Sequence, residues 1–424
     1  MRDMADNPQA EPATPTAEAR QPHRARAAIA RAMEAWVAVF RRKLSAGELG
    51  ALPVVLVLAA VWIIFQALNE NFLSPRNLSN LSVDIVGTGL IAVGIVFVLL
   101  LGELDLSVGS ISGLAAAVFA VLNVNNGVPE WLALIVAVLA GTAAGTVQGY
   151  SFAKTRVPAF VVTLAGLLTW NGLMLYILGT SGTVNLDENG LVAKLTSYYF
   201  TNDGAAYAVA AVATGMVFLM SYVGSRRRKS VGMPHRSLRG IALRTGAVAA
   251  IAFATAYVLN QFQGLPLALL IFLVVVAGLD IVLRRTHYGR QVYALGGSVE
   301  AARRASLGVT RVQTAVLAVS GTMAAVGGLF LASRITSVSQ SSGSGVLLLN
   351  AIAAAVIGGT SLFGGRGSTW SAVLGMLVIQ SIASGMAITD TPTAVQFVIT
   401  GGVLFAAVVI DSLSRRSQEA HGRA

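Results

Sequence analysis

Long apolar runs separated by short polar segments dominate the pattern of the chain. A helix needs about 20 mostly apolar residues to cross about 30 Å of hydrocarbon. Runs of this kind lie at residues 50–68, 83–101, 107–123, 131–152, 158–179, 204–223, 242–260, 266–283, 312–332, 346–361, 369–386 and 393–410. Several of them are short or interrupted by glycine. The pattern therefore predicts about 12 membrane-spanning segments, with about 10 as the lower bound.

Composition favours a membrane protein over a soluble one. Hydrophobic residues make up 55% of the 424 residues and charged residues only 12%, whereas a soluble domain carries about 25% charged residues. The mean hydropathy is +0.71, and 44 glycines suit helices that pack closely in lipid. The predicted fold class is all-α, a polytopic membrane protein.

The distribution of Lys and Arg predicts the orientation in the membrane. Cytoplasmic loops of membrane proteins carry an excess of these residues. With the N-terminus placed inside and the twelve segments threaded in order, 27 of the 30 Lys and Arg residues fall on the cytoplasmic side. The three on the other side are Arg76, Lys194 and Arg334. Both termini are therefore predicted to be cytoplasmic.

The ends of the chain differ from its apolar middle. Residues 1–24 are rich in Ala, Pro, Thr, Glu and Arg without an apolar period, which is typical of a disordered tail. From Ala25 to Leu44, apolar residues at helical spacing alternate with arginines. This pattern fits a basic helix on an anionic membrane surface and equally an ordinary solvated helix. The predicted division is a cytoplasmic region 1–48, a membrane domain 49–411 and a cytoplasmic tail 412–424.

The stretch Leu101-Gly-Glu-Leu-Asp-Leu-Ser-Val-Gly-Ser110 places two carboxylates between apolar runs. A carboxylate at a helix centre costs about 2.5 to 3.5 kcal/mol on insertion scales, so an intramembrane Asp indicates a functional site by default. The glycines and the Asp-x-Ser spacing predict a broken or re-entrant helix near 102–110, in which Asp105 accepts hydrogen bonds from amides of the following helix. A cap that shapes the pore and a direct contact with substrate hydroxyls both remain open.

A second polar stretch, residues 349–368, holds five glycines in the ten positions from Gly358. Such density of small residues suits a dimer seam, a kinked gate or plain helix packing. The stretch is not a phosphate loop, because the Gly-x4-Gly-Lys-Ser/Thr pattern is absent and none of the four lysines follows a glycine. The chain is therefore not expected to bind ATP in that way.

A third polar stretch, residues 289–309, lies in the predicted cytoplasmic loop 284–311. Ser298 is a candidate N-cap for a short helix that runs to Leu307. Small residues on one face of that helix, with Arg303 and Arg304 nearby, fit a groove of another protein. A solvated connecting helix would show a similar pattern.

Several kinds of chemistry are excluded or disfavoured. The chain has no cysteine, and its four histidines, His23, His235, His287 and His421, lie in tails or predicted cytoplasmic loops, so neither a histidine metal cluster nor an intramembrane histidine relay is expected. The carboxylates within or beside the spans are Asp84, Glu103, Asp105, Asp280 and Asp390. Among them, ion pairing with Arg284 explains Asp280. An enzyme is not expected, and no metal site is predicted.

Two of these motifs resemble those of the transmembrane permease subunits of bacterial ABC importers for ribose, xylose and related sugars, and the resemblance covers most of residues 50–411. The first motif is carried by Gly102, Asp105, Leu106, Ser107, Val108, Gly109 and Ser110. The second resembles the coupling helix of that family and is carried by Tyr293, Ala294, Gly296, Gly297, Glu300, Ala301, Ala302, Arg303, Gly308 and Val309.

The resemblance implies a permease for a monosaccharide such as xylose or a related pentose or hexose, in a bacterial inner membrane. It further implies a permease homodimer, a separate cytoplasmic ATPase subunit that holds ATP and Mg, and an extracytoplasmic sugar-binding protein. Lipid is the solvent, and no nucleic acid or cofactor of this chain is expected. The candidate substrate-pathway residues are Glu103, Asp105, Ser107, Ser110, Asn171 and Asn350. The candidate ATPase-coupling residues are Gly296, Gly297, Ser298, Glu300, Ala301, Ala302 and Arg303.

The chain departs from the family pattern at three places. Asn350 stands where the family commonly has Asp, and Glu103 stands where it often has Gly. An additional helix pair around 204–260, linked by Arg226-Arg-Arg-Lys229, places the chain nearer to the xylose or multiple-sugar branch. Permeases for autoinducer, nucleoside or branched-chain amino acid are alternatives within the class. An ion-coupled secondary transporter is the alternative outside it, with Asp105 and Glu103 as its ion site.

Overall fold

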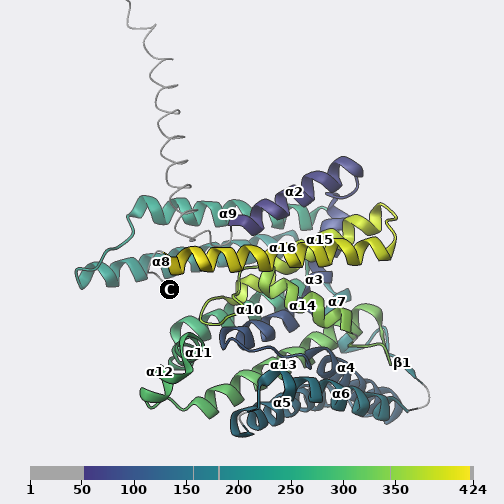
Figure 1. Cartoon of the computed structure of the whole chain (residues 1–424). Coiled ribbons are helices and arrows are strands. Elements are labelled where there is room, and N and C mark those ends of the chain that lie inside the picture. Colours follow the sequence, from purple (N-terminus) through teal and green to yellow (C-terminus); the bar gives the residue numbers. More distant parts are fainter. Residues whose placement is uncertain (1–51, 156, 180–181, 344, 421–424) are drawn as a thin grey trace, which may run out of the picture. The chain divides into compact units, whose positions relative to one another are not determined.

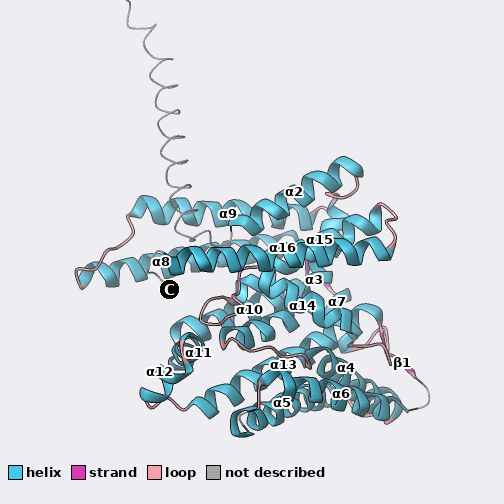
Figure 2. Cartoon of the chain, viewed as in Figure 1, coloured by secondary structure: helices cyan, strands magenta, loops and turns pink. Residues whose placement is uncertain are grey.

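The computed structural model describes residues 52–155, 157–179, 182–343 and 345–420 (Figure 1). The tail and the basic helix predicted within 1–48 lie outside the described residues. The compact unit that concerns function is Ala51–Asp411. Its secondary structure is almost entirely helical (Figure 2).

The helices follow one another along the chain, joined by short loops and four very short strands. The helices are α2 (Leu52–Leu68), α3 (Pro75–Leu100), α4 (Val108–Ala120) with a π-helical continuation (Val121–Asn125), α5 (Glu130–Thr155), α6 (Ala159–Leu178), α7 (Leu191–Ser197), α8 (Asp203–Ser230), α9 (Leu238–Asn260), α10 (Leu267–Arg285), α11 (His287–Gly297), α12 (Val299–Arg304), α13 (Val309–Ile335), α14 (Gly345–Ile357), α15 (Thr369–Ile388) and α16 (Thr393–Ala420). The strands are β1 (Thr183–Asn185), β2 (Tyr199–Phe200), β3 (Leu265–Pro266) and β4 (Ser337–Ser339).

The predicted all-α polytopic fold is confirmed. Within the described residues, nine helices are long and apolar enough to cross a membrane, and three shorter apolar helices, Leu52–Leu68, Gly345–Ile357 and Thr393–Ala406, accompany them. Each of the twelve predicted segments falls on one of these helices. The largest difference at the start of a helix is at α3, which begins at Pro75 rather than at 83, because Ser74 caps it by accepting from the Asn77 amide.

Two helices form the centre of the membrane unit. α3 is buried along nearly its whole length from Val83 to Leu100. α13 packs against α3, α4 and α5. Gly141, Gly145 and Gly149 of α5 face α13 so closely that a Cβ on any of them would strike an α13 backbone or side-chain atom. Small residues at these positions let the two backbones approach, as they do in other membrane helix pairs.

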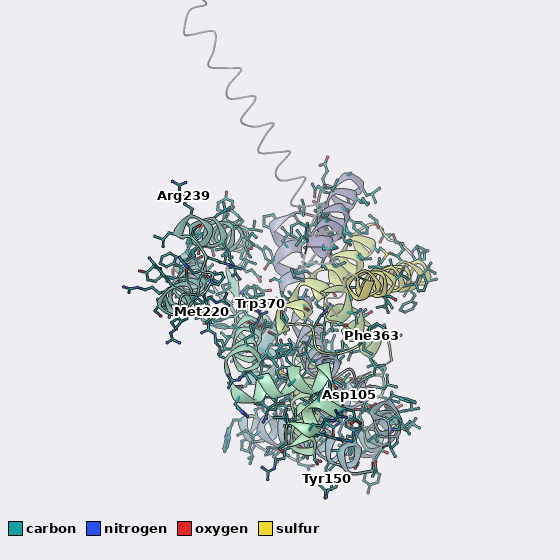
Figure 3. All side chains as sticks on the ribbon, turned by 60° about the vertical axis from the view of Figure 1, so that its left-hand side comes forward. Asp105, Tyr150, Met220, Arg239, Phe363 and Trp370 are labelled. Carbon is teal, nitrogen blue, oxygen red and sulfur yellow. The ribbon has the colours of Figure 1, made fainter. Side chains whose placement is uncertain are left out.

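The additional helix pair around 204–260 is present as α8 and α9, which pack on each other. Only Ala206, Ala210, Ile241, Ala256 and Leu259 of the two helices are buried. Figure 3 labels Met220 on α8 and Arg239 on α9, both away from the interior position of Asp105. Apolar side chains exposed over this length are expected where lipid is the solvent.

Two small antiparallel sheets tie distant segments together on the side predicted to be extracytoplasmic. β1 pairs with β4, with Val184 opposite Val338. β2 pairs with β3, with Tyr199 opposite Pro266. Glu130 at the start of α5 accepts a hydrogen bond from the Leu191 amide at the start of α7. These contacts hold the loop between α6 and α8 against the rest of the unit.

Candidate functional site

The predicted helix break is present between α3 and α4. α3 ends at Leu100 and α4 begins at Val108. Gly102 lies between them with φ of +76°, a backbone conformation that favours glycine. The structure therefore confirms that the helix is interrupted at the motif, over residues 101–107 against the predicted range 102–110.

Asp105 is the central polar group of the break and is only 1% exposed. Its Oδ1 accepts from the Ser107 amide at 3.0 Å and from Ser107 Oγ at 2.6 Å. Its Oδ2 accepts from Ser320 Oγ of α13 at 2.8 Å. The carboxylate thus accepts a hydrogen bond from the amide of Ser107, the residue that precedes α4. The predicted hydrogen bonds from amides within α4 are not formed. It fastens the break to α13, and hydrogen bonding of this kind offsets the cost of its burial.

The other substrate-pathway candidates are placed in different surroundings. Ser110 is buried beside the break and donates to the Ser107 carbonyl at 2.9 Å. Glu103 is half-buried, and within the described residues its amide donates to the Val98 carbonyl while its carboxylate makes no hydrogen bond. Asn171 is exposed on α6, and Asn350 is half-buried on α14. The structure therefore brings Asp105, Ser107 and Ser110 together and leaves Glu103, Asn171 and Asn350 apart from that cluster.

Three residues of the break's surroundings were missed by the sequence analysis. Ser320 on α13 holds Asp105. Gln148 on α5 is 3% exposed, and its side-chain oxygen as placed lies 2.8 Å from Ser107 Oγ. Trp170 on α6 has a buried indole nitrogen close to Gly166, which Gln148 also approaches. A polar Gln in the middle of an apolar span was the only local signal available for any of them.

A second interruption faces the first. After β4, the chain reaches α14 through a loop that contains Ser342 and Gly343, the latter with φ of +79°. A Cβ on Gly343 would strike the Gly109 carbonyl of α4, and a Cβ on Gly113 would strike the Ser342 carbonyl. The amino-terminal part of α4 and the loop before α14 are therefore in direct backbone contact. Substrate sites of transporters are often formed by discontinuous helices.

The glycine-rich stretch forms the loop between α14 and α15, and this loop touches the break. Gly365 donates its amide to the Leu100 carbonyl at 2.9 Å. A Cβ on Gly102 would lie 3.2 Å from the Phe363 carbonyl oxygen. The loop has positive φ at Gly359, Gly364, Gly365 and Gly367, and only glycine adopts these angles readily. We call residues 358–367 the glycine loop.

The predicted coupling region 284–311 folds as two helices, α11 and α12. Ser298 caps α12 as predicted, and its Oγ accepts from the Ala301 amide at 3.2 Å. α12 ends at Arg304 rather than at Leu307, because Ser306 takes a positive φ of 57°. Glu300, Ala301 and Arg303 are exposed, whereas Ala302 is buried against the protein.

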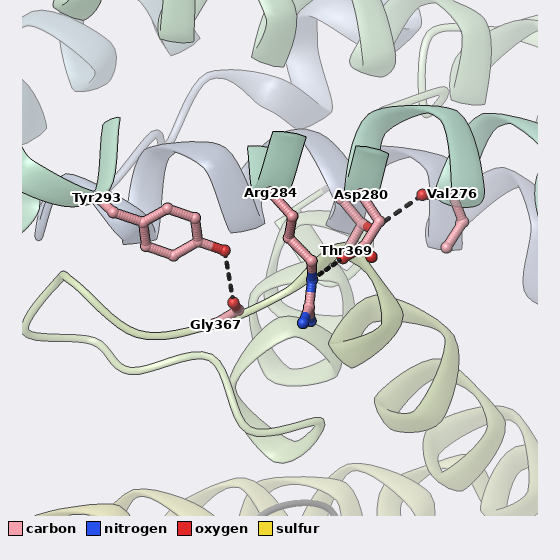
Figure 4. Close-up of polar contacts among 6 residues, drawn as sticks. All are labelled: Val276, Asp280, Arg284, Tyr293, Gly367 and Thr369. Carbon is pink, nitrogen blue, oxygen red and sulfur yellow. Dashed lines mark hydrogen bonds and ion pairs between the residues drawn. The ribbon is translucent and has the colours of Figure 1, made fainter. Parts of the chain in front are cut away.

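Contacts of α11 link this region to the glycine loop (Figure 4). Tyr293 Oη donates to the Gly367 carbonyl at 2.9 Å. Burial raises the pKa of the Tyr293 hydroxyl, which keeps it a donor throughout the neutral range. Gly296 lies directly under the Leu100 carbonyl, where a Cβ would clash. One end of the coupling region therefore contacts both the glycine loop and the last turn of α3.

An ion pair and an open cavity lie beside the same contacts. The predicted pairing of Asp280 with Arg284 is confirmed, with 2.8 Å between Arg284 Nε and Asp280 Oδ1. A cavity of about 500 Å³ is lined by Leu283, Arg284, Arg290, Tyr293 and Gly367. Across the described residues there is no group of three or more His, Cys, Asp or Glu side chains that could hold a metal.

An all-helical unit whose described residues include nine helices long and apolar enough to cross a membrane, with a buried polar cluster at a helix break, is typical of a membrane transport protein. Residues 77–408 match the family described as "Branched-chain amino acid transport system / permease component". The chain belongs to this permease family. It is a multi-pass protein of the bacterial inner membrane and a transport subunit.

Curated relatives extend the comparison. The xylose transport system permease protein of Escherichia coli is 38% identical over 81% of this chain and 87% of its own length. The ribose import permease protein of Bacillus subtilis is 31% identical over 82% of this chain and 88% of its length. The L-arabinose ABC transporter permease protein of Azospirillum brasilense is 29% identical over 87% of this chain and 89% of its length. No solved structure matches the chain significantly.

Proposed function

We propose that this chain is the permease subunit of an ATP-driven importer for a monosaccharide, with xylose as the first candidate. The observation that carries the substrate class is the 38% identity to a xylose permease over 81% of the chain, with ribose and L-arabinose permeases as further relatives. The broader family description names branched-chain amino acids, so a branched-chain amino acid is the substrate to test against sugars.

ATP hydrolysis is proposed to take place on a separate ATPase subunit that docks on α12. Three features support this location. α12 is short and exposed, and it lies on the side predicted to be cytoplasmic. Its buried Ala302 anchors it while Glu300 and Arg303 face outward. Its neighbour α11 contacts the glycine loop through Tyr293 and the end of α3 through Gly296. Movement of α12 is thereby able to reach the break.

The substrate pathway is proposed to pass between the two interrupted segments. Glu103, Asn171 and Asn350 are half-buried or exposed in the single subunit and are proposed to line it. Asp105, Ser107 and Ser110 are buried and mutually hydrogen bonded, so they are proposed to shape it. Two copies of the chain are proposed to enclose the pathway, with an extracytoplasmic binding protein delivering the sugar. The mass of the detergent-solubilised protein tests the proposed dimer.

Reconstitution in proteoliposomes with a candidate ATPase subunit and binding protein tests the proposal. We expect xylose to stimulate ATP hydrolysis in the wild type and to lose at least most of that effect in Glu300→Arg, because a reversed charge on exposed α12 disturbs the docking surface. Lys154→Glu is the control, since it reverses a charge at the exposed end of α5 on the same predicted side.

Three outcomes would contradict the proposal in different ways. Stimulation by a branched-chain amino acid but by no sugar would overturn the substrate class. Uptake driven by an ion gradient without any ATPase would establish a secondary transporter. Equal losses in Glu300→Arg and Lys154→Glu would remove α12 from the docking surface.

A further inference from the structure

The hydroxyl group of Ser107 has two acceptors but only one proton. Its Oγ lies 2.6 Å from Asp105 Oδ1 and 2.8 Å from the side-chain oxygen of Gln148 as that amide is placed. A serine hydroxyl donates one hydrogen bond, and an ionised carboxylate can only accept. The shorter contact has the length of a charge-assisted O–H···O⁻ bond. When Ser107 donates its proton to Asp105, no proton is left between Ser107 Oγ and the Gln148 side-chain oxygen, and two acceptors face each other.

The other end of the Gln148 amide has the opposite difficulty. Its Nε2 is buried without an acceptor within the described residues, and so is Trp170 Nε1. Both nitrogens approach Gly166. Trp170 Nε1 is 3.1 Å from the point where a Cβ on Gly166 would sit, and Gln148 Nε2 is closer still. Two buried N–H donors therefore share one small space, and a buried donor without an acceptor destabilises the folded protein.

A single change resolves both conflicts. The oxygen and nitrogen of a Gln amide have nearly the same shape, and their assignment follows from the hydrogen bonds that they make. With the two atoms exchanged, Nε2 donates to Ser107 Oγ, and Oε1 is the acceptor that faces Trp170 Nε1. The Ser107 hydroxyl then has a single acceptor for its proton, and the Trp170 N–H faces an acceptor instead of a second donor.

We propose that Gln148 is the positioning residue of the helix break, with Nε2 toward Ser107 and Oε1 toward Trp170. A continuous hydrogen-bonded chain then runs from Ser320 through Asp105, Ser107 and Gln148 to Trp170. It joins the break to α13, α5 and α6. The importance of these hydrogen bonds for transport rests on the proposed function, whereas the hydrogen bonds themselves do not depend on it.

Variants that discriminate the two orientations are Trp170→Phe and Gln148→Met. In the proposed orientation Trp170→Phe leaves the Gln148 oxygen without its donor, so the unfolding temperature of the purified protein in detergent falls. In the opposite orientation the same change removes an unpaired donor, so the unfolding temperature stays or rises. The proposed chain also predicts coupling, in which Gln148→Met with Trp170→Phe is less destabilising than the two single effects added together.

A matched control is available on the same two central helices. Thr142 Oγ1 of α5 and Thr322 Oγ1 of α13 are 2.8 Å apart and hydrogen bonded, and neither is a partner in the bonds of Asp105, Ser107 or Gln148. Thr142→Val removes this bond and leaves the series of hydrogen bonds from Ser320 to Trp170 unchanged. We expect Thr142→Val and Trp170→Phe to show additive effects on the unfolding temperature, because they share no partner.

The decisive readout is the indole N–H resonance of Trp170 in protein labelled with ¹⁵N-tryptophan. The chain has five tryptophans, and Trp170→Phe identifies the resonance by its disappearance. We expect the Trp170 proton to move upfield in Gln148→Met, which lacks an acceptor, and to stay in place in Thr142→Val. An unmoved resonance together with a neutral Trp170→Phe would overturn the proposed orientation.

Transport measurements separate this proposal from the proposed function. We expect Gln148→Met to keep its ATPase partner but to lose several-fold of the sugar stimulation, because the amino end of α4 is no longer fixed. If the resonance and the coupling behave as described while no sugar stimulates the wild type, the chain of hydrogen bonds stands and the sugar importer does not.

Discussion

Arg334 of α13 and Asp84 of α3 form an ion pair, with 2.8 Å between Arg334 Nε and Asp84 Oδ1. The same helix α13 carries Ser320, which holds Asp105 at the break after α3. Fourteen residues separate Ser320 from Arg334 along α13, or about 21 Å at 1.5 Å per residue. The two central helices are thus joined by polar contacts at well-separated levels, with glycine contacts such as Gly87 against Gly327 between them.

The ion pair is expected to stabilise the protein modestly. Both side chains are about one-third exposed, and exposed pairs contribute about 1 kcal/mol or less. We expect Asp84→Asn to lower the unfolding temperature slightly, and the exchange Asp84→Arg with Arg334→Asp to recover part of the loss. Thermal unfolding in detergent measures both, and a double exchange worse than the sum of its single changes would count against a stabilising pair.

Gly296 and Gly297 provide a matched test of close packing in the coupling region. A Cβ on Gly296 would clash with the Leu100 carbonyl, whereas a Cβ on Gly297 has nothing within 4 Å. We therefore expect Gly296→Ala to lower the free energy of unfolding by about 1 to 3 kcal/mol, as overpacking does, and so to lower the unfolding temperature clearly. Gly297→Ala should leave the unfolding temperature unchanged. Equal effects of the two substitutions would show that α11 does not pack against α3 as described.

Tyr293 is expected to carry motion from α11 to the glycine loop. Tyr293→Phe removes only the hydroxyl that donates to Gly367, a bond worth about 0.5 to 1.5 kcal/mol. We expect ATPase binding to be retained and stimulation by sugar to fall several-fold in proteoliposomes. Tyr150→Phe is the control, because Tyr150 is exposed on α5. Unchanged stimulation in Tyr293→Phe would mean that the glycine loop receives its signal elsewhere.

Features whose interacting residues lie close together in the sequence were predicted, whereas features that join distant parts of the sequence were not. The break after α3, the Ser298 cap and the Asp280–Arg284 pair rest on residues within a few positions of one another, and local spacing predicted all three. Asp105 was placed in the break, but its fastening to Ser320 depends on a partner 215 positions away. Gln148 and Trp170 both approach Gly166 only because α5 and α6 pack together, and no local pattern carries that information.

The short helices show a second limit. α11 was not predicted, and α12 was predicted to run three residues too far, because both lie outside the lipid-spanning segments where a long apolar period is decisive. The glycine loop was predicted as a seam, a gate or plain packing. Its actual contacts, with Leu100 on one side and Tyr293 on the other, follow from tertiary structure.

Glu103 gives the protein a predictable dependence on pH. Burial raises the pKa of the Glu103 carboxyl above its ordinary value of about 4.3. A raised acid pKa favours the protonated form in the folded protein, so this group contributes stability that is present below the ordinary value and is lost as pH rises through the raised value. We expect Glu103→Gln to melt higher than the wild type at neutral pH.

The difference between the two proteins should shrink as the pH is lowered toward the ordinary pKa of glutamate, where Glu103 is protonated in both the folded and the unfolded chain. Thermal unfolding at a series of pH values measures this. A difference that is constant with pH would mean that the charge of Glu103 does not cause it.

The orientation of the chain in the membrane can be tested with introduced cysteines. The protein contains no cysteine of its own, so a maleimide labels only the introduced one. Single cysteines at Arg227, in the last turn of α8, and at Lys194 on α7 are predicted to lie on opposite sides. We expect a membrane-impermeant maleimide to label Lys194→Cys in intact spheroplasts and to label Arg227→Cys only after the membrane is broken. Both positions lie at exposed sites, so burial does not block the reagent. Labelling of Arg227→Cys in intact spheroplasts would invert the topology and would place α12, with its proposed ATPase contact, on the wrong side of the membrane for ATP.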